Sequence, residues 1–433
     1  MNMPINYSKE NFAIYGLGRT GVSVINYFKR VKFKNYIIYD DKKSVRRAWG
    51  INKKKENSFF KNINFVNYII ISPGIDIKKT RLHKFYLKNK HKFITDLDLF
   101  YMFHKNIKSI VVTGTNGKST TCKIIEHILN KNNIKSELGG NIGSPVLNLS
   151  LKSKSLIIIE ASSFQLSYSK FIKPDFAIIL NISKDHIDWH GSMKNYLQSK
   201  LKIFSLQDKK QLALLNDNKL IRNFKKNRFK GNLKKVDNKN YFKIKKKIKN
   251  DYLKSEVNDE NMSFICKISE ILNIKKKSLI KSLTSFKGLS HRHEVFLKKN
   301  NKIFINDSKA TSFSSTKFAL KNNKNIFWIV GGLPKKGDKF DLSDVKKNII
   351  KSYIIGKHMN SFQKYIKRKI NYKLCKTLKN AVVSILNDIK KIQNKKITIL
   401  LSPASASYDQ FKNFEERGNQ FKKFVKLYRK KYV

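Results

Sequence analysis

The chain has 433 residues, which at roughly 150 residues per domain suggests about three domains. Its 92 Lys and Arg residues outnumber 30 Asp and Glu residues, so the formal net charge is +62. Hydrophobic residues make up 40% and aromatic residues 12%, a composition that favours packed cores over wholesale disorder.

Several protein classes are disfavoured by the sequence. No apolar run approaches the ~18 residues that span a bilayer, and the first ten residues show no export signal. Three widely spaced cysteines predict neither a disulfide framework nor a CxxC metal site. We therefore expect a cytoplasmic protein that does not insert into membranes.

The excess of lysine raises the question of nucleic-acid binding. Only 11 of the 92 basic residues are arginine, whose planar fork suits phosphates and bases best. The densest basic stretch, Lys225 to Asn250, has 12 basic residues in 26, and its apolar residues predict strands with a solvated lysine face. We therefore predict a solvated surface and no nucleic-acid partner, with nucleic-acid binding as the alternative.

The first block of the chain predicts a βαβ unit. An apolar strand at 12–15 leads into Gly16-Leu17-Gly18-Arg19-Thr20-Gly21, a helical pattern follows, and a strand at 36–39 ends at Asp40. A GxGxxG turn with a later acid is typical of a dinucleotide site. The same crevice suits the nucleotide portion of a substrate, and a purely structural turn is a third interpretation. The block continues with a strand at 68–71, which ends at Ser72-Pro73-Gly74, and with a connector at 96–104.

A second block carries the strongest motif. The strand at 109–113 runs directly into Gly114-Thr115-Asn116-Gly117-Lys118-Ser119-Thr120, and a helix continues from there. This string keeps the GKST end of the P-loop pattern, with two residues instead of four between its glycines. Such a loop binds phosphates through backbone N–H groups, with Lys118 on the β and γ oxygens and the Ser119 hydroxyl on Mg²⁺. The sequence therefore predicts an ATP site.

Two further strands of this block end in polar residues. The strand at 156–159 ends at Glu160, and the strand at 176–180 leads to Asp185 and His186. Because the carboxyl ends of parallel strands share one sheet edge, we expect Glu160 and His186 beside the ATP loop. The alternative for His186 is a structural role, as a polar residue at a strand end whose hydrogen bonds are made within the protein. Lys200 is one of many lysines, and its sequence context alone does not indicate a function. Helices are expected at 193–204 and 260–283.

The last block again alternates strands and helices. Two polar strand-to-helix turns, 306–311 and 402–418, are either ligand loops or ordinary helix caps. Strands are expected at 302–305, 326–330, 353–355 and 397–401.

Together these motifs resemble the Mur ligase family of cell-wall enzymes, and within it the branch that adds D-glutamate. The resemblance runs nearly end to end, and the string SPASASYDQFKNFEERG at 402–418 is specific for that branch. The other matching strings are GLGRTG (16–21), SPG (72–74), GTNGKST (114–120), GGNIG (139–143), EASSFQL (160–166), DH (185–186), GLSHRHE (288–294), NDSKAT (306–311) and GG (331–332).

The resemblance implies an α/β fold of three domains. Residues 1–96 would form a Rossmann-like domain that binds the UDP-substrate, 97–288 a P-loop ATPase-like domain with a parallel sheet, and 289–433 a Rossmann-like domain that binds the amino acid. The implied enzyme is a monomeric ATP-dependent ligase of peptidoglycan precursor synthesis, which adds D-glutamate to UDP-N-acetylmuramoyl-L-alanine. ATP would first convert the alanyl carboxylate into an acyl phosphate, which the glutamate amine attacks, so no protein nucleophile is needed.

The resemblance also implies a role for individual residues. Mg²⁺ would be positioned by Glu160, His186, a carbamylated Lys200 and Ser119, with Lys118 as the catalytic cation. ATP would be bound by Gly114, Thr115, Asn116, Gly117, Lys118, Ser119, Thr120, Asn261, Arg292 and Asp307. The two substrates would be bound by Gly18, Arg19, Thr20, Asp40, Ser72, Gly74, Asn141, Ser162, Gln165, Lys309, Thr311, Lys335, Ser407 and Phe414.

The chain departs from the family pattern in three places. The usual Gly-x-His-Asn reads Glu256-Val257-Asn258, and the usual Thr-Glu-Asp-His reads Ser183-Lys184-Asp185-His186. The pair Lys335 and Lys336 leaves open which lysine fills the single acceptor position. The rival functions are a folylpolyglutamate-type ligase, a nucleic-acid-binding P-loop protein and a dinucleotide oxidoreductase.

Overall fold

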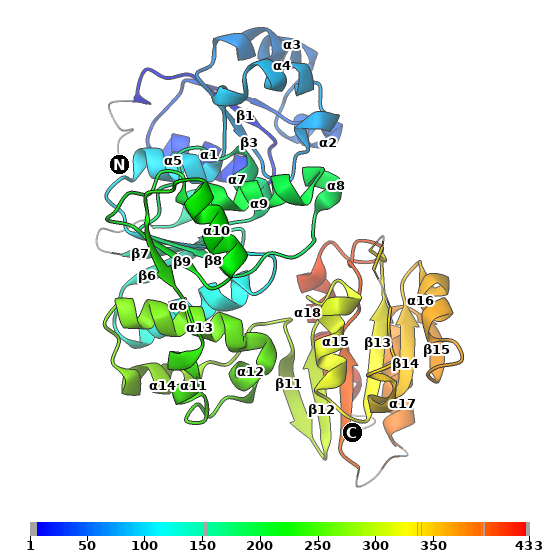
Figure 1. The fold of residues 1–433 in the computed structure, drawn as a ribbon. Helices are drawn as coiled ribbons and strands as arrows, with labels where there is room; N and C mark the ends of the chain where they lie inside the picture. Colours follow the sequence, from blue (N-terminus) through cyan, green and yellow to red (C-terminus); the bar gives the residue numbers. More distant parts are fainter. Residues whose placement is uncertain are drawn as a thin grey trace. The chain divides into compact units, whose positions relative to one another are not determined.

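A computed structural model describes residues 7–150, 155–335, 337–338, 340–390, 392 and 395–429. The chain forms two compact units, of which the first ends at Phe286 and the second starts at Lys287. Both units consist of sheets flanked by helices (Figure 1), so the predicted α/β class with three largely parallel sheets is confirmed. The domain boundaries at 96/97 and 288/289 stay predictions. In the described ranges, no helix is long and apolar enough to cross a membrane.

The first sheet packs around a short, fully buried strand. Its elements are β1 (Phe12–Tyr15), α1 (Arg19–Arg30), β2 (Tyr36–Tyr39), α2 (Lys43–Ala48), α3 (Lys53–Asn62), β3 (Tyr68–Ile71), α4 (His83–Lys88) and β4 (Phe93–Ile94). The strands pair in parallel in the order β2-β1-β3-β4, and α1 buries Val24, Ile25 and Phe28. The strand order reverses between β1 and β3, so the loops after these strands flank the crevice where such sheets bind ligands.

The central sheet of the first unit carries the predicted ATP loop. Its elements are α5 (Asp96–Phe103), β5 (Ser109–Thr113), α6 (Lys118–Lys131), β6 (Ser136–Gly140), β7 (Leu156–Glu160), α7 (Ser163–Tyr168), β8 (Phe176–Ile179), α8 (Ile187–His190), α9 (Met193–Leu201), β9 (Leu212–Leu215), α10 (Asn218–Lys226) and β10 (Asn232–Lys235). All neighbours in the order β10-β9-β8-β5-β7-β6 pair in parallel. Val112 pairs with Glu160 and Thr113 with Ile179, which brings the ends of β7 and β8 to the start of the loop.

Helices complete the first unit. They are α11 (Lys239–Lys245), α12 (Asp251–Lys254), α13 (Glu256–Ile271) and α14 (Lys276–Ser285). The apolar face of α13 is buried through Met262, Phe264, Ile265 and Ile268, and α13 and α14 both pack against α6. The helix that follows the ATP loop is thus held by two further helices.

The second unit is built on a mostly parallel sheet in the order β11-β12-β16-β13-β14-β15. Its elements are β11 (Glu294–Lys299), β12 (Lys302–Asn306), α15 (Phe313–Lys321), β13 (Ile326–Gly331), β14 (Ile349–Ile355), α16 (Met359–Ile366), β15 (Tyr372–Lys376), α17 (Leu378–Lys390), β16 (Ile397–Leu401) and α18 (Phe414–Tyr428). Only β11 runs antiparallel to its neighbour. Asn306 pairs with Leu401, so the loops after β12 and β16 lie side by side.

Two predictions of local structure are wrong. Residues 96–104 are not a connector, because α5 starts at Asp96 with a capping box between Thr95 and Asp98. Such a box satisfies the free N–H groups of the first turn, and the two acids were a helix-start signal. In the basic stretch, only β10 is a strand; Tyr241 and Ile244 are buried at helical spacing in α11.

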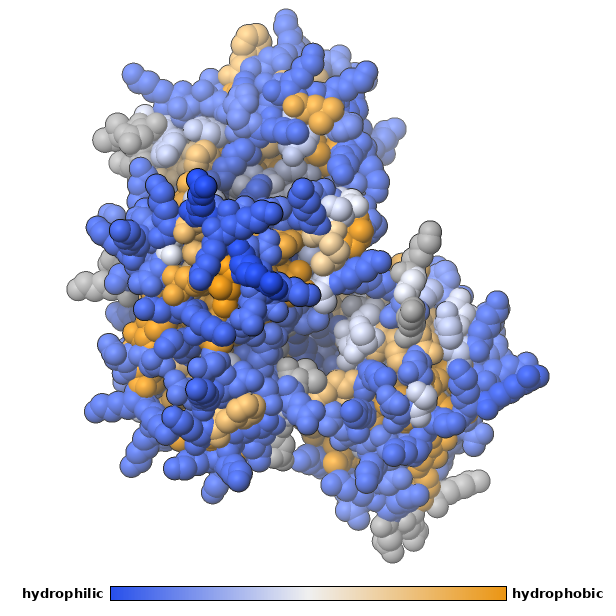
Figure 2. All heavy atoms as spheres, in the orientation of Figure 1, coloured by the Kyte–Doolittle hydropathy of each residue, from blue (hydrophilic) through white to orange (hydrophobic). Residues whose placement is uncertain are grey.

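Most lysines of the basic stretch point outward, as predicted, although Lys245 is half-buried and pairs with Asp259. Lys225, Lys226, Lys230, Lys235 and Lys243 are all exposed. Figure 2 shows hydrophilic side chains over most of the visible face, interrupted by smaller hydrophobic areas. The charge of this stretch is therefore carried by solvated side chains.

Candidate functional site

The ATP loop needs glycine at its last position. Gly117 has φ +83°, a left-handed conformation that costs any residue with a Cβ, and α6 starts at the next residue. A Cβ at this position would lie 2.1 Å from Oδ1 of Asn261 on α13. The structure therefore brings together two of the predicted ATP-binding positions, the loop and Asn261.

Lys118 folds back over the loop. Its Nζ donates hydrogen bonds to the carbonyl oxygens of Gly114, at 2.8 Å, and Thr115, at 2.9 Å. Ser119 and Thr120 follow in the first turn of α6 and are buried. The cation and the hydroxyl groups thus lie at the helix N-terminus, where backbone N–H groups and the helix dipole attract anions.

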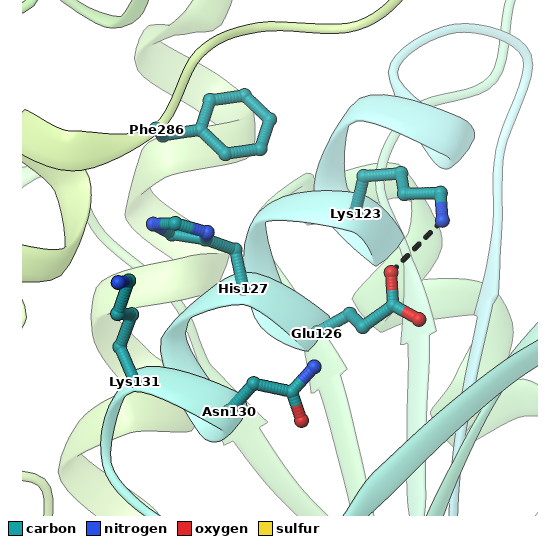
Figure 3. A pocket seen from close by; sticks show the side chains of 6 residues that line it. All are labelled: Lys123, Glu126, His127, Asn130, Lys131 and Phe286. Carbon is teal, nitrogen blue, oxygen red and sulfur yellow. Dashed lines mark hydrogen bonds and ion pairs between the residues drawn. The ribbon is translucent and has the colours of Figure 1, made fainter.

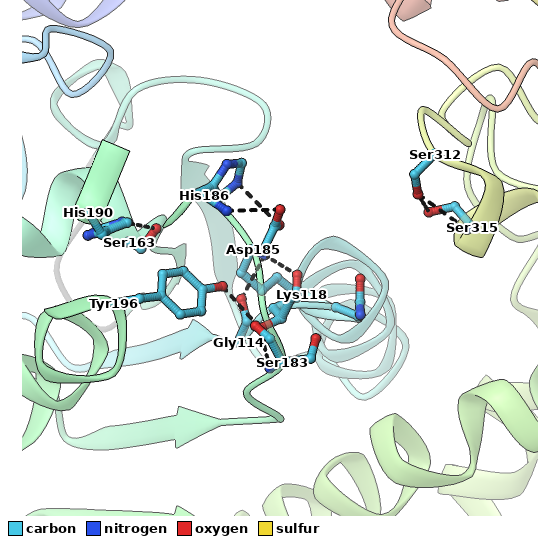
Figure 4. Close-up of polar contacts among 12 residues, drawn as sticks. Gly114, Lys118, Ser163, Ser183, Asp185, His186, His190, Tyr196, Ser312 and Ser315 are labelled. Atoms are coloured by element: carbon cyan, nitrogen blue, oxygen red, sulfur yellow. Dashed lines mark hydrogen bonds and ion pairs between the residues drawn. The ribbon is translucent and has the colours of Figure 1, made fainter. Parts of the chain in front are cut away.

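The end of β8 anchors the loop. The backbone N–H of Thr115 donates to the carbonyl of Asn181 at 2.9 Å, and the N–H of Asn116 donates to Oδ1 of Asn181 at 2.9 Å. The Thr115 hydroxyl accepts from the Ser183 N–H at 3.0 Å and lies 3.0 Å from the Tyr196 hydroxyl. Figure 4 shows Tyr196 directed toward this loop. The end of β8 and Tyr196 therefore help to hold the loop in shape.

Glu160 is buried beside the loop, and only one of its two carboxylate oxygens has a hydrogen-bond partner among the described residues. Its side chain is only 2% exposed, and Oε1 accepts a hydrogen bond from Nδ2 of Asn141 at 2.8 Å. Oε2 is buried without a hydrogen-bond partner among the described residues. A buried carboxylate oxygen without a partner is costly, and a cation would satisfy it. Glu160 therefore fits the predicted role of a magnesium ligand.

His186 lies at the start of α8 with an unusual backbone. Its φ is +51°, and Nε2 lies 3.3 Å from Oδ2 of Asp185. The ring packs against Phe164, with centroids 4.7 Å apart, and Phe164 in turn stacks on His190. Figure 4 shows Asp185 and the His186 ring directed toward each other. Across the described ranges, no three His, Cys, Asp or Glu side chains form a cluster able to hold a metal ion by themselves.

Lys200 is buried under the ATP loop. It is 1% exposed, its Nζ donates to the carbonyl of Gly114 at 2.9 Å, and it lies 4.8 Å from the ring centre of Tyr196. Burial, and then the positive charge of Lys118, hold the pKa of the Lys200 amine well below its usual range. Its sequence neighbours carried no signal for this lysine, and only the resemblance singled it out.

Ser162 and Gln165 use their side chains to start α7. Oε1 of Gln165 accepts from both the N–H and the hydroxyl of Ser162 at 3.1 Å, and its Nε2 donates to Oδ1 of Asp96 at 3.5 Å. Burial raises the pKa of Asp96 to about 6. Sequence reasoning missed Asp96, although the capping-box pattern of α5 was present.

The candidate UDP residues gather at the ends of β1 and β3. Gly18, Arg19 and Gly74 are exposed there, Thr20 and Ser72 are half-buried, and the Ser72 hydroxyl donates to the carbonyl of Gly16 at 2.8 Å. The structure thus brings the GxGxxG turn and the SPG string together at one edge of the sheet.

Asp40 uses its carboxylate on its own surroundings. Oδ2 accepts from the N–H of Leu17 at 2.7 Å, and Oδ1 accepts from the N–H of Lys42 at 2.8 Å. The side chain of Arg19 reaches the carbonyl of Gly143, in the loop that carries Asn141. Asp40 therefore fixes the glycine turn, in addition to any contact with a ligand.

The second unit holds the remaining predicted residues. The carboxylate of Asp307 accepts from the Ser402 hydroxyl at 2.6 Å and the His293 N–H at 3.0 Å, and burial raises its pKa to about 7. Nζ of Lys309 lies 3.7 Å from the ring centre of Phe414. Ser407 is buried, Arg292 and Thr311 are half-buried, and Lys335 is exposed.

Three of the basic residues of the second unit need separate comment. Lys336 lies outside the described residues, so the choice between it and Lys335 stays open. Arg292 and Asp307 belong to a different unit from the ATP loop, and their part in ATP binding stays a prediction. Sequence reasoning missed Arg417, which is buried and donates to the carbonyl groups of Ser308 and Ser405.

One open hollow on the first unit holds none of the predicted residues. It measures about 370 Å³ and lies on the outer face of α6 (Figure 3). His127 crosses its floor and bonds to the Ser282 carbonyl at 3.0 Å, which fixes α6 to α14. The histidine in this hollow therefore has a structural role, in the contact between α6 and α14.

The loop, the strand-end carboxylate and the three α/β sheets define a nucleotide-binding enzyme of the P-loop type. A family model described as the Mur ligase middle domain matches residues 112–279, and one for the Mur ligase MurD-like N-terminal domain matches residues 10–91. The chain is 35% identical to the UDP-N-acetylmuramoylalanine--D-glutamate ligase of Rickettsia felis, over 97% of this chain and 98% of that protein. It is 33% identical to the protein of the same name from the Wolbachia of Brugia malayi, over 97% of each. This chain therefore belongs to the Mur ligase family of ATP-dependent ligases.

Solved structures support the same fold. The UDP-N-acetylmuramate-alanine ligase MurC of Thermotoga maritima matches with a TM-score of 0.55 at 14% identity, over 97% of this chain and 99% of that chain. MurF of Acinetobacter baumannii matches with a TM-score of 0.56 at 16% identity, over 74% and 77%. The predicted three-domain Mur ligase architecture is thus confirmed.

Proposed function

We propose that this chain joins D-glutamate to UDP-N-acetylmuramoyl-L-alanine, with cleavage of ATP to ADP and phosphate. The observation that carries this proposal is the full-length similarity, at 33–35% identity, to proteins named for that reaction. The ATP loop, with Lys118 folded over it and Glu160 beside it, supports the ATP-dependent half of the reaction.

The chemistry needs an activated carboxylate, because an ionised carboxylate is a poor electrophile. The N–H groups of the loop and the cation of Lys118 would hold the γ-phosphoryl group while the alanyl carboxylate attacks it, which yields an acyl phosphate and ADP. The amine of D-glutamate would then attack the acyl carbon, and phosphate would leave. In the first step, the phosphoryl oxygens on which charge develops would face the positive end of α6.

Mg²⁺ would be held by Glu160, His186, Ser119 and a carbamylated Lys200. The ion would supply positive charge that offsets the phosphate groups. The unpartnered Oε2 of Glu160, in the described part of the chain, supports this assignment. Addition of CO₂ to a neutral lysine amine gives a carbamate and releases a proton, and the buried Lys200, with its lowered pKa, suits the neutral form that this addition requires.

The substrates would occupy opposite ends of the chain. The UDP group would lie at the ends of β1 and β3, beside Gly18, Arg19, Thr20, Ser72 and Gly74. The exposure of three of these residues supports that placement. The muramoyl arm would lie near the loops that carry Asn141, Ser162 and Gln165.

D-glutamate would bind on the second unit, near Lys309, Thr311, Lys335, Ser407 and Phe414. The side-by-side loops after β12 and β16 support this assignment, because they bring the two motifs into one place. Arg292 and Asp307 would reach ATP from the same unit, together with Asn261 from the first. A monomeric state and a cytoplasmic location stay predictions.

A phosphate-release assay tests the proposal. UDP-N-acetylmuramoyl-L-alanine, ATP and Mg²⁺ are combined with each enantiomer of glutamate, and release is expected with the D-enantiomer only. Controls omit the UDP-substrate or ATP. Release with a folate substrate and L-glutamate would favour the folylpolyglutamate-type rival, and salt-sensitive nucleic-acid binding without turnover would favour the nucleic-acid rival.

A further inference from the structure

Glu260 lies on α13 and contacts the ends of two central strands. Its Oε2 accepts a hydrogen bond from Nδ2 of Asn181, 2.5 Å away, just after β8. Its Oε1 accepts from Nδ2 of Asn216, 2.9 Å away, just after β9. Both partners lie at strand ends and outside the ATP loop itself, and no motif singled Glu260 out in the sequence.

Asn181 connects Glu260 to the loop. While its Nδ2 donates to Glu260, its Oδ1 accepts from the backbone N–H of Asn116 at 2.9 Å. Nδ2 also lies 3.4 Å from the carbonyl of Asn116, a much weaker contact. One side-chain amide therefore bridges an acid on α13 and a loop N–H group.

The orientation of that amide depends on what it faces. A carboxylate can only accept hydrogen bonds, whereas an amide end can either donate or accept. Because Glu260 only accepts, it holds the NH₂ end of Asn181 toward itself and leaves the oxygen to face the Asn116 N–H. If the amide turned over, two donors would meet at Asn116 and the loop would lose this anchor.

The charge of Glu260 also needs a reason. A carboxylate close to a site for a triphosphate repels it, so an acid is electrostatically unfavourable there. A neutral group would be preferred if only packing mattered. The acceptor-only character of the carboxylate accounts for its presence.

We infer that Glu260 is a positioning residue of the ATP site, which acts through Asn181 to hold the Asn116 segment of the loop in its nucleotide-binding shape. The inference rests on the proposed function only through the ATP site. It assigns Glu260 no contact with the nucleotide or with the reacting atoms.

The first test is Glu260→Ala, with ATP affinity measured by calorimetry and thermal unfolding measured in parallel. We expect ATP binding to weaken about tenfold, the scale of one hydrogen bond to a charged group. The matched control is Glu256→Ala, which removes an exposed acid from the same helix. Removing a negative charge alone strengthens the binding of an anion or leaves it unchanged. We therefore expect ATP affinity to fall in Glu260→Ala and to stay the same or rise in Glu256→Ala.

A second control separates the two contacts of Glu260. Asn216→Ala removes only the contact at Oε1, and ATP affinity is expected to stay within about twofold of the wild type. Glu260→Gln alone is less informative, because Oδ1 of Asn216 has no hydrogen-bond partner in the described structure. Asn216 could turn its amide and accept from the new NH₂ group.

The decisive test exchanges the two partners. Asn181→Asp places two carboxylates face to face and is expected to weaken ATP binding more than Glu260→Ala does. Adding Glu260→Gln supplies an NH₂ donor toward the new acid, keeps the net charge, and leaves an acceptor for the Asn116 N–H. The double variant is expected to regain ATP affinity to within about threefold of the wild type.

The outcomes separate the inference from the proposed function. If Glu260→Ala binds ATP like the wild type, or if the double variant is no better than Asn181→Asp, the inference is overturned. A lower unfolding temperature with unchanged ATP affinity also overturns it, because it shows a role in stability alone. A wild-type chain that binds ATP without D-glutamate-dependent phosphate release overturns the proposed function only, and one that binds no ATP overturns both.

Discussion

Gly117→Ala is expected to remove most ATP affinity without unfolding the chain. The left-handed backbone at φ +83° costs a residue with a Cβ about 1–2 kcal/mol. The new Cβ would lie 2.1 Å from Oδ1 of Asn261, so that side chain must move and lose its 3.2 Å bond to Asn258. This loss adds about 1 kcal/mol. The sum of about 2–3 kcal/mol corresponds to a roughly 30- to 150-fold weaker affinity if the nucleotide-binding loop conformation bears it.

Calorimetry with ATP measures the affinity, and thermal unfolding measures the fold. The control is Gly50→Ala, because Gly50 has a φ of +60° and a Cβ added there would meet no other atom within 4 Å in the described structure. That variant carries the backbone cost without the collision, and its ATP affinity is expected to equal the wild type. Wild-type ATP affinity in Gly117→Ala would refute the reasoning, because it would show that the loop tolerates both the strain and the displaced Asn261.

Three further substitutions test the other parts of the site. Lys118→Ala is expected to abolish ATP turnover, whereas Lys123→Ala on the same helix is expected to keep it; comparable turnover in both would remove the loop assignment. Asp40→Ala is expected to weaken binding of the UDP-substrate, because the N–H of Leu17 loses its acceptor, and to leave ATP affinity unchanged in calorimetry. Lys200→Ala is expected to lose most activity and regain part of it with short-chain carboxylic acids, and Lys200→Arg is expected to resist that rescue because its cation is permanent. Near-normal turnover of Lys200→Ala in CO₂-depleted buffer would contradict the carbamate.

The arrangement at the sheet edges could be predicted from sequence. An apolar strand followed by a polar residue places that residue at the carboxyl end of a parallel sheet, and Glu160 beside the loop follows this rule. The glycine pattern at 114–117 likewise predicted a loop between a strand and a helix, and α6 starts directly after it. The strand end and the loop are each local, so a short stretch of chain determines them, and the pairing of β5 with β7 brings them together.

Other features depend on contacts between distant parts of the chain. Nothing near Lys200 in the sequence distinguishes it from other lysines, because the groups that its amine bonds to, the Thr113 hydroxyl and the Gly114 carbonyl, come from a distant part of the chain. Asp96 looked like the start of a connector, and only the fold shows it buried and bonded to Gln165. Burial of a polar residue is decided by tertiary packing, which its neighbours in sequence do not reveal.

Residue type also does not reveal which polar atoms already have a hydrogen-bond partner within the protein. Asp40 and Glu160 are both acids at strand ends, and sequence reasoning gave both a ligand. In the structure, each oxygen of Asp40 accepts a backbone N–H, whereas one oxygen of Glu160 has no partner in the described residues. The two acids therefore differ in what they can offer a cation or a hydroxyl group.

Two motifs of the second unit that are distant in sequence lie side by side in the fold. The strings at 306–311 and 402–418 follow β12 and β16, which pair directly, so their loops meet. Arg417, from the second string, donates to the carbonyl of Ser308 at 2.8 Å in the first and to the carbonyl of Ser405 at 3.0 Å in its own. Both bonds come from Nη2, and Nε donates a further bond to the Ser308 hydroxyl at 3.0 Å, so this buried guanidinium satisfies groups of both loops at once. The arginine in that string thus couples the loop with Asp307 and Lys309 to the loop with Ser407.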